Sequence, residues 1–173
     1  GPLVEQKLVS EISDEEWGRA VAVETHGFFH ATKAILPHMK VSGGGSIVHL
    51  GSAGHLRWPP RDGLSVIPKA ANESLIKGIA REEGEHGIRA NSVLVGVIDA
   101  GMFHELMKKG AFPPEWEAET KKMLSIKRWG QPEEIAHSAR HIIAHSLHRI
   151  HYIIIVIKII KMTLPFRIKV FSK

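Results

Sequence analysis

Apolar side chains recur at helical spacing near the start of the chain. The recurring positions are Trp17, Val21, Phe28, Ala31, Ile35 and Met39. Their spacings of three, four and seven residues are typical of a helix that buries one face. Just before them, Ser13 and Glu16 stand three residues apart, as in a capping box that starts a helix. We therefore predict a loop over residues 1–12 and a long helix over residues 14–40.

A strand, a helix and a second strand are predicted next. Glycines at 43–45 indicate a turn, and the apolar residues 47–50 after them indicate a buried strand. A helix is predicted over residues 68–84, because Pro68 is tolerated only where a helix begins. Its apolar positions share one face: Ala71, Leu75, Ile76, Ile79 and Ala80. Residues 88–95 indicate the second strand. This order predicts an α/β fold in which helices flank a parallel sheet.

The rest of the chain changes character towards its end. Trp116 and Trp129 are expected in the core or in a lid, and residues 131–148 predict a further helix. Residues 149–173 are rich in Ile and Lys. We expect them to form a strand or, alternatively, an exposed, aggregation-prone or interfacial segment. The chain is therefore divided into an α/β domain at residues 1–148 and a basic tail.

The net charge of +5 does not indicate a nucleic-acid partner. Six of the 23 Lys and Arg residues lie within residues 149–173, where no acid occurs, so 17 basic and 18 acidic residues remain elsewhere. The tail, and not a binding face, carries the basicity. No cysteine is present, which excludes disulfides and Cys-ligated metals. No apolar run approaches the roughly 20 residues that span a membrane, and a cytoplasmic location is expected.

A histidine-rich stretch offers one alternative function. His137, His141, His145 and His148 follow at spacings of four, four and three residues, which places them on one face of the predicted helix. Two imidazoles one helical turn apart bind zinc in many proteins. The competing interpretation is that these histidines are incidental, because no cysteine completes a tetrahedral set.

Three phrases resemble the short-chain dehydrogenase/reductase family in wording, order and separation. They are "GGGSIVHLGSAG", "KAANESLIKGIAREEGEHGIRANSV" and "VGVIDAGM", and the resemblance extends over about residues 1–137. It implies a Rossmann-type, doubly wound parallel sheet flanked by helices. The implied activity is hydride transfer between NAD or NADP and a small alcohol or ketone.

The resemblance assigns the candidate catalytic residues position by position. Ser52 stands at the family's catalytic serine, which holds the substrate oxygen. Lys69 stands at the lysine that bonds the cofactor ribose and lowers the pKa of a catalytic tyrosine. Ser65, four residues earlier, occupies the place of that tyrosine. Glu24 stands where the family has an asparagine.

The resemblance also assigns cofactor contacts. Gly96 and Ile98 lie in the segment that meets the nicotinamide, together with Lys69 at the ribose. Ala100 stands where a threonine commonly contacts the nicotinamide amide. The family's glycine-rich TGxxxGxG turn has no counterpart in the sequence, so the resemblance covers the second half of the fold. The Gly43–Gly45 stretch does not replace that turn, because it precedes a strand.

These departures imply an impaired enzyme. An aliphatic hydroxyl at Ser65 is a far weaker acid than a phenol, and the only tyrosine, Tyr152, lies in the tail. We expect the chain to bind NAD or NADP weakly or not at all. The alternatives are a non-catalytic interaction protein and a truncated gene product. In the family, the two long helices pair across a dimer interface, so the resemblance implies a homo-oligomer through helices 14–40 and 68–84.

Overall fold

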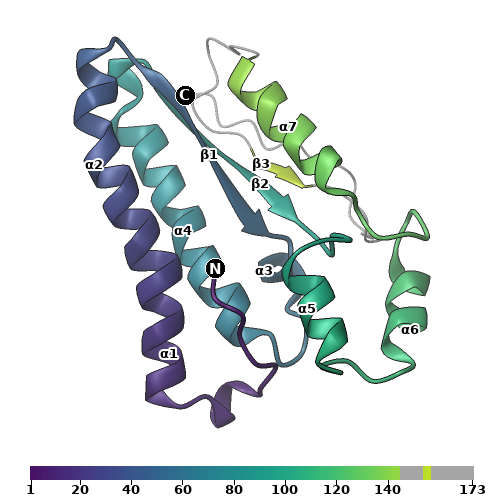
Figure 1. The fold of residues 1–173 in the computed structure, drawn as a ribbon. Helices are drawn as coiled ribbons and strands as arrows, with labels where there is room; N and C mark the ends of the chain where they lie inside the picture. The colour runs from purple at the N-terminus through teal and green to yellow at the C-terminus, as the bar shows by residue number, and fades with distance from the viewer. Residues whose placement is uncertain (145–153, 157–173) are drawn as a thin grey trace.

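The computed structural model describes residues 1–144 and 154–156, which form a small parallel sheet between two layers of helices (Figure 1). Strands β1 (Gly45–Ser52) and β2 (Ile88–Val95) pair in parallel, and β3 (Ile154–Val156) adds to the other edge of β2. The strand order is β1-β2-β3. The predicted α/β class, the parallel pairing and the bounds of the second strand are confirmed.

The helices cover both faces of this sheet. One layer holds α1 (Asp14–Val21), α2 (Gly27–Val41) and α4 (Gly63–Glu82), and α7 (Pro132–Ala144) lies against β1 and β2 on the opposite side (Figure 1). Shorter helices complete the chain: the 3-10 turns η1 (Val9–Glu11) and η3 (Gly84–His86), then α3 (Gly54–Arg57), α5 (Met102–Lys108) and α6 (Trp116–Met123). None of the helices in this part of the chain combines the length and apolarity needed to cross a membrane.

The capping box at the start of α1 is confirmed. The Glu16 N–H donates to Ser13 Oγ at 3.2 Å, and the Ser13 N–H donates to Glu16 Oε2 at 2.9 Å. The pKa of Glu16 falls to about 2, because its carboxylate accepts from Lys7 and from Ser13. The first helix therefore begins where its sequence predicted.

The buried face predicted for the first helix is wrong in part. Trp17, Ala31 and Ile35 are exposed, whereas Ala20 and Thr32 are buried. The cause is a π-helical turn, η2 (Ala22–His26), which joins α1 to α2. A π turn holds more residues than an α turn, so it rotates the following helix about its axis. A buried face predicted with one constant helical spacing is therefore wrong for the residues beyond such a turn.

The predicted start of the second helix is also wrong. Helix α4 begins at Gly63, so Pro68 lies inside it. The proline removes one main-chain hydrogen bond near the helix start, and its ring is fully buried. Burial of the ring offsets part of that loss. Ala71, which was predicted on the apolar face of α4, is exposed, so that part of the prediction is wrong.

Glycines set the start of both long strands. Gly44 and Gly87 have φ angles of +124° and +73°, and a Cβ built on Gly44 would lie 2.5 Å from the Gly87 carbonyl oxygen. The two turns therefore touch main chain to main chain. The Gly45 N–H donates to the Gly87 oxygen at 3.2 Å, and Gly45 pairs with Ile88 at the start of the ladder.

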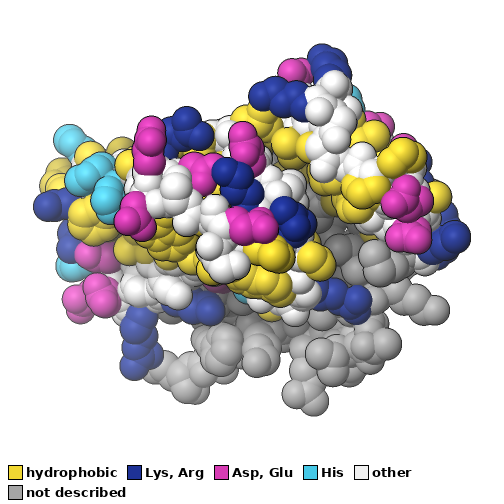
Figure 2. Space-filling model, turned by 90° about the horizontal axis from the view of Figure 1, so that it is seen from below, with side chains coloured by type: hydrophobic (Ala, Val, Ile, Leu, Met, Phe, Trp, Pro, Cys, Tyr) yellow, Lys and Arg dark blue, Asp and Glu magenta, His cyan; other side chains and the backbone are white. Residues whose placement is uncertain are grey.

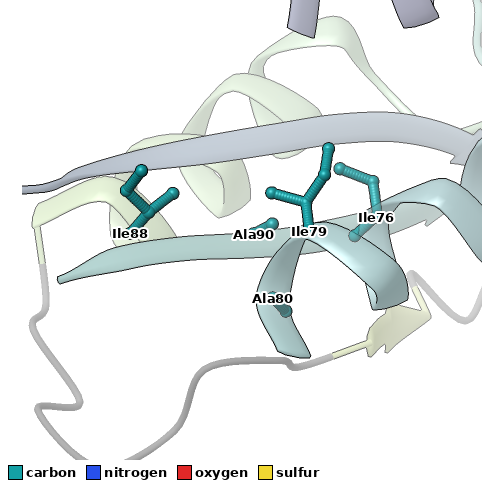
Figure 3. Packing of buried hydrophobic residues seen from close by; sticks show 5 residues of the cluster. All are labelled: Ile76, Ile79, Ala80, Ile88 and Ala90. Carbon is teal, nitrogen blue, oxygen red and sulfur yellow. The ribbon is translucent and has the colours of Figure 1, made fainter. Parts of the chain in front are cut away.

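The main core lies between α4 and β2. Its buried members are Ile76, Ile79, Ala80, Ile88 and Ala90 (Figure 3). A second cluster forms around Leu124 and Trp129, against which Phe103 and Trp116 pack. Trp116 and Trp129 stack with ring centroids 5.7 Å apart. Of the two residues predicted in the core or in a lid, Trp129 is buried in the core, whereas Trp116 is only partly buried against it.

Truncation of the central core residue tests this packing. We expect Ile76→Ala to lower the free energy of unfolding by about 2–5 kcal/mol, because it leaves a cavity beside Ile88. Denaturant-induced unfolding measures this loss. The matched control is Ala118→Ser at an exposed position of α6, which should change stability by no more than about 0.5 kcal/mol. Equal effects of the two changes would contradict the packing.

Candidate functional site

Lys69 is held by a carboxylate from the neighbouring helix. Its Nζ donates to Glu24 Oε1 at 2.9 Å and to the Ser65 carbonyl oxygen at 3.4 Å. The side chains of Lys69 and Glu24 are only 16% and 14% exposed. This ion pair therefore joins the π turn to the first half of α4 in a largely water-excluded place.

The π turn positions Glu24 for this contact. The Asn72 amide Nδ2 donates to the main-chain oxygen of Glu24 at 3.1 Å. The Thr25 hydroxyl donates to the Pro68 carbonyl oxygen at 3.4 Å. Two polar bonds thus connect the turn to α4 beside the ion pair, and π turns often occur at functional sites.

A cavity of about 50 Å³ opens beside the ion pair. Its polar lining comprises Gln6, Glu24, Asp62, Ser65 and Lys69, and its apolar lining comprises Pro2, Leu3, Val4, Leu64, Met102 and Leu106. The structure thus brings two of the predicted catalytic residues, Ser65 and Lys69, to one cavity. Ser52 and the predicted cofactor residues Gly96 and Ile98 are not among its lining residues.

The carboxylates of this cavity have opposite electrostatic environments. Burial by itself raises the pKa of Glu24, but the hydrogen bond and charge of Lys69 lower it, as does the Gly1 ammonium at 3.5 Å from Oε1, and the net pKa is below the ordinary value. Burial raises the pKa of Asp62, although Gln6 donates to its Oδ1 at 3.0 Å. One acid is therefore kept ionised and the other is pushed towards its neutral form.

Ser52 serves the local turn at the carboxyl end of β1. Its Oγ accepts from the Gly54 N–H at 3.0 Å, and a Cβ built on Gly54 would lie 2.9 Å from the same oxygen. The hydroxyl is partly buried. Its accepting lone pair is used within the turn, while its proton remains available to a second group.

Gly96 and Ile98 follow β2 at the same end of the sheet. A Cβ built on Gly96 would meet nothing within 4 Å, so its main chain is open to a ligand on that side. Ile98 forms an isolated parallel bridge with Gly130 and packs against the Leu124 and Trp129 cluster. The structure therefore gives Ile98 a packing role in addition to the predicted one.

The described residues fit only part of a nicotinamide dinucleotide. Of the predicted cofactor residues, Lys69 offers an ammonium on the cavity and Gly96 offers open main chain after β2. A pyrophosphate is usually held by a glycine-rich turn between a strand and a helix N-terminus. In residues 1–144, β1 leads into the four-residue α3, and β2 leads into α5 through residues 96–101, so neither connection is such a turn.

The histidine-rich alternative gains no geometric support. His137 and His141 are exposed on α7, and His145 lies outside the described residues. No group of three or more potential ligands in residues 1–144 and 154–156 is arranged to hold a metal ion.

Sequence reasoning missed two residues of the site. Asp62 lines the cavity from the position just before α4, and Asn72 reaches the π turn from the same helix. Asp62 carries a weak signal, because an acid before a helix reads as an N-cap. Asn72 falls among apolar residues of a helix and carries no signal without its tertiary partner.

Known proteins resemble the chain at the level of sequence. A family model described as enoyl-(acyl carrier protein) reductase matches residues 2–151. A protein of Xanthobacter autotrophicus, inactive 2-(S)-hydroxypropyl-CoM dehydrogenase 2, is 37% identical over 72% of this chain and 54% of its own length. A cyclohexanol dehydrogenase of Acinetobacter is 33% identical over 79% of this chain and 51% of its own length. The chain spans about half the length of the curated relatives it matches.

Solved structures share the fold. A short-chain type dehydrogenase/reductase from Mycobacterium ulcerans has a TM-score of 0.81 and 21% identity, over 91% of this chain and 56% of that one. A xylitol dehydrogenase with bound NAD+ has a TM-score of 0.81 and 18% identity, over 92% of this chain and 65% of that one. At these identities the likeness shows the arrangement of elements alone.

The Glu24–Lys69 pair predicts a pH-dependent stability. The folded pKa of Glu24 lies below its ordinary value of 4.5, so its contribution is present above about pH 4.5 and is lost as the pH falls through the lowered pKa. We expect Glu24→Gln to cost about 1–3 kcal/mol near pH 7, between the values for exposed and fully buried pairs. In denaturant unfolding, the difference from the parent should shrink at a pH below 4.5, as the pH falls through the lowered pKa.

The control is Glu119→Gln, a similar change at an exposed position of α6. It should leave stability nearly unchanged at both pH values. A Glu24→Gln effect that stays constant with pH would contradict the ion pair.

Proposed function

Because the chain belongs to the short-chain dehydrogenase/reductase family, we propose that it carries a nicotinamide-linked alcohol/ketone site that is impaired in hydride transfer. The observation that carries this proposal is the engagement of Lys69 by Glu24 at 2.9 Å, with Ser65 on the same cavity. Both features lie inside the matched segment, so the proposal does not depend on where the chain begins or ends.

The first impairment concerns the proton. Reduction of a ketone adds a hydride to the carbonyl carbon and a proton to the oxygen. A positioned general acid typically contributes about 10²–10⁴-fold to such a step. A tyrosine phenol, with a reference pKa near 10, is within reach of tuning by a neighbouring ammonium, whereas a serine hydroxyl is not. Ser65 therefore removes the family's proton donor.

The second impairment concerns Lys69. In the family resemblance, this ammonium bonds the cofactor ribose and acts on the tyrosine. Here its nearest acceptor is the carboxylate of Glu24. A charged partner holds the ammonium more strongly than a neutral asparagine would. We infer that Lys69 is less available to a ribose hydroxyl, whether NAD or NADP is offered.

The names of two relatives bear on the proposed impairment and on its assay. The protein of Xanthobacter autotrophicus at 37% identity bears the word inactive in its name. The cyclohexanol dehydrogenase of Acinetobacter, at 33% identity, is named for an activity on a small alcohol. Cyclohexanone with NADH or NADPH is therefore a suitable assay for the proposed chemistry.

A restored proton donor tests the proposal. The parent should oxidise neither NADH nor NADPH measurably with cyclohexanone or a panel of small ketones. At a nucleotide concentration raised until calorimetry detects binding, Ser65→Tyr combined with Glu24→Asn should exceed Glu24→Asn alone by about 10²–10⁴-fold in rate, because only the former returns a phenol beside a released Lys69. Absorbance of the reduced nicotinamide follows the reaction. Parent turnover near the enzyme median of about 10 s⁻¹ would contradict impairment.

A second candidate function is self-association through the long helices. Val23 and Ile35 are exposed apolar residues on the helix pair α1–α2, at 52% and 46% exposure. Ala71 and Ser74 are exposed residues with small side chains on α4. Such surfaces favour burial against a second copy of the chain.

Figure 2 shows basic and acidic side chains interspersed over the coloured, described part of the face that it presents, so that part carries no single-sign patch.

Light scattering tests this second function. The parent should have the mass of a dimer or higher oligomer, and Val23→Glu with Ile35→Glu should shift it towards the monomer, because two charges would be buried in the interface. The control is Ile126→Glu, at a residue that is also 52% exposed but follows α6. A monomeric parent, or equal effects of both changes, would contradict the interface.

A further inference from the structure

Asn72 is a buried polar residue in the middle of α4. Its side chain is 2% exposed, and its Nδ2 donates to the main-chain oxygen of Glu24 at 3.1 Å. Its Oδ1 is also buried and accepts no hydrogen bond from the described part of the chain. An apolar residue of similar volume would be the cheaper choice for packing alone, because a buried amide costs free energy wherever it lacks a partner. The hydrogen bond to the Glu24 carbonyl is therefore the interaction that explains an amide at this position.

That bond goes to the residue that Lys69 holds. Lys69 and Asn72 are three residues apart in α4, so they lie on the same side of the helix. Helix α4 thus binds Glu24 at two places: Lys69 binds its side-chain carboxylate, and Asn72 binds its main-chain carbonyl.

The Asn72 amide is a second donor to the Glu24 carbonyl. Glu24 lies in the π turn, where the regular α-helical bonding pattern is interrupted, and its carbonyl also accepts from the Gly27 N–H at the end of that turn. The Asn72 amide adds a bond to the same oxygen from α4, so it ties the main chain of the turn to that helix at the residue whose side chain binds Lys69. Loss of the amide removes this tie and would loosen the contact between Glu24 and Lys69.

We propose that Asn72 is a positioning residue that fixes Glu24 against Lys69 and thereby keeps Lys69 engaged. The inference rests on the proposed function for the importance of Lys69, which it deepens by naming the residue that holds Glu24 in place. Asn72 touches no reacting atom in this account. Its effect passes through the main chain of the π turn.

Titration of Glu24 tests the proposal without an activity assay. Carboxyl carbon NMR of the parent should give a pKa for Glu24 below 4.5, because Lys69 lowers it. Asn72→Leu removes the amide donor and keeps the same branched arrangement of side-chain heavy atoms, and the pKa of Glu24 should then rise towards or above 4.5. The Tm of each variant reports whether it is folded. A folded Asn72→Leu variant in which Glu24 titrates as in the parent would overturn the proposal.

Two further variants separate positioning from general loosening of the helix pair. Thr25→Val removes the longer bond to Pro68 and should leave the Glu24 titration unchanged. Lys69→Met should raise the pKa of Glu24, although the Gly1 ammonium at 3.5 Å from Glu24 Oε1 still lowers it. Adding Asn72→Leu should then change the pKa less than it does in the parent, because the contact with Lys69 is already gone. An equal shift from Thr25→Val and Asn72→Leu would overturn a specific role for Asn72. Asn72→Ser, whose hydroxyl is too short for the carbonyl, replaces the leucine variant if that variant does not fold.

The same measurements distinguish this inference from the proposed function. Turnover of NADH by the parent would defeat the proposed impairment and leave the titration result standing. An unchanged Glu24 titration in Asn72→Leu would defeat the inference and leave the impairment standing.

Discussion

A single ion pair, between Glu24 and Lys69, determines how the two longest helical segments meet at the candidate site. It links the π turn to the first half of α4, and both charges are largely removed from water. A charge in such a place is tolerated only with a partner, so each residue restricts the other. The contact joins two residues that line the cavity, lowers the pKa of Glu24 and occupies the ammonium of Lys69. Glu24, at the position where the resemblance places an asparagine, is thus the counter-ion of Lys69.

Much of the fold could be read from the sequence because its signals are local. The capping box at Ser13, the glycines before the first strand and the apolar run of residues 88–95 each depend on neighbours along the chain. The π turn could not be read in the same way. It depends on bonds from α4, which is distant in sequence, and a helical pattern gives no sign of one extra residue in a turn. The buried face of the first helix was misplaced for the same reason.

The residues of the candidate site differ in the same way: some have a local sequence signal and others do not. Ser65 and Lys69 were identified because a motif carries them at fixed spacing, and they meet at one cavity. Glu24 was noticed only as a departure from a pattern, and its contact with Lys69 required the packing of two helices. Asp62 belongs to no motif, and Asn72 lies inside a family phrase that assigns it no role. Their roles arise from burial and from partners at long sequence separation, which are properties of the folded chain and not of a window of residues.

The main-chain contact of Gly44 with Gly87 has an evolutionary consequence. Both glycines lie at the amino ends of the strands, far along the sheet from Ser52 and Gly96 at the carboxyl ends. Neither position has room or a suitable dihedral angle for a side chain, so almost every non-synonymous change in these two codons should be purged. Ser65 lies in a regular helix and is only partly buried, so its side chain can vary in size where the two turns allow none.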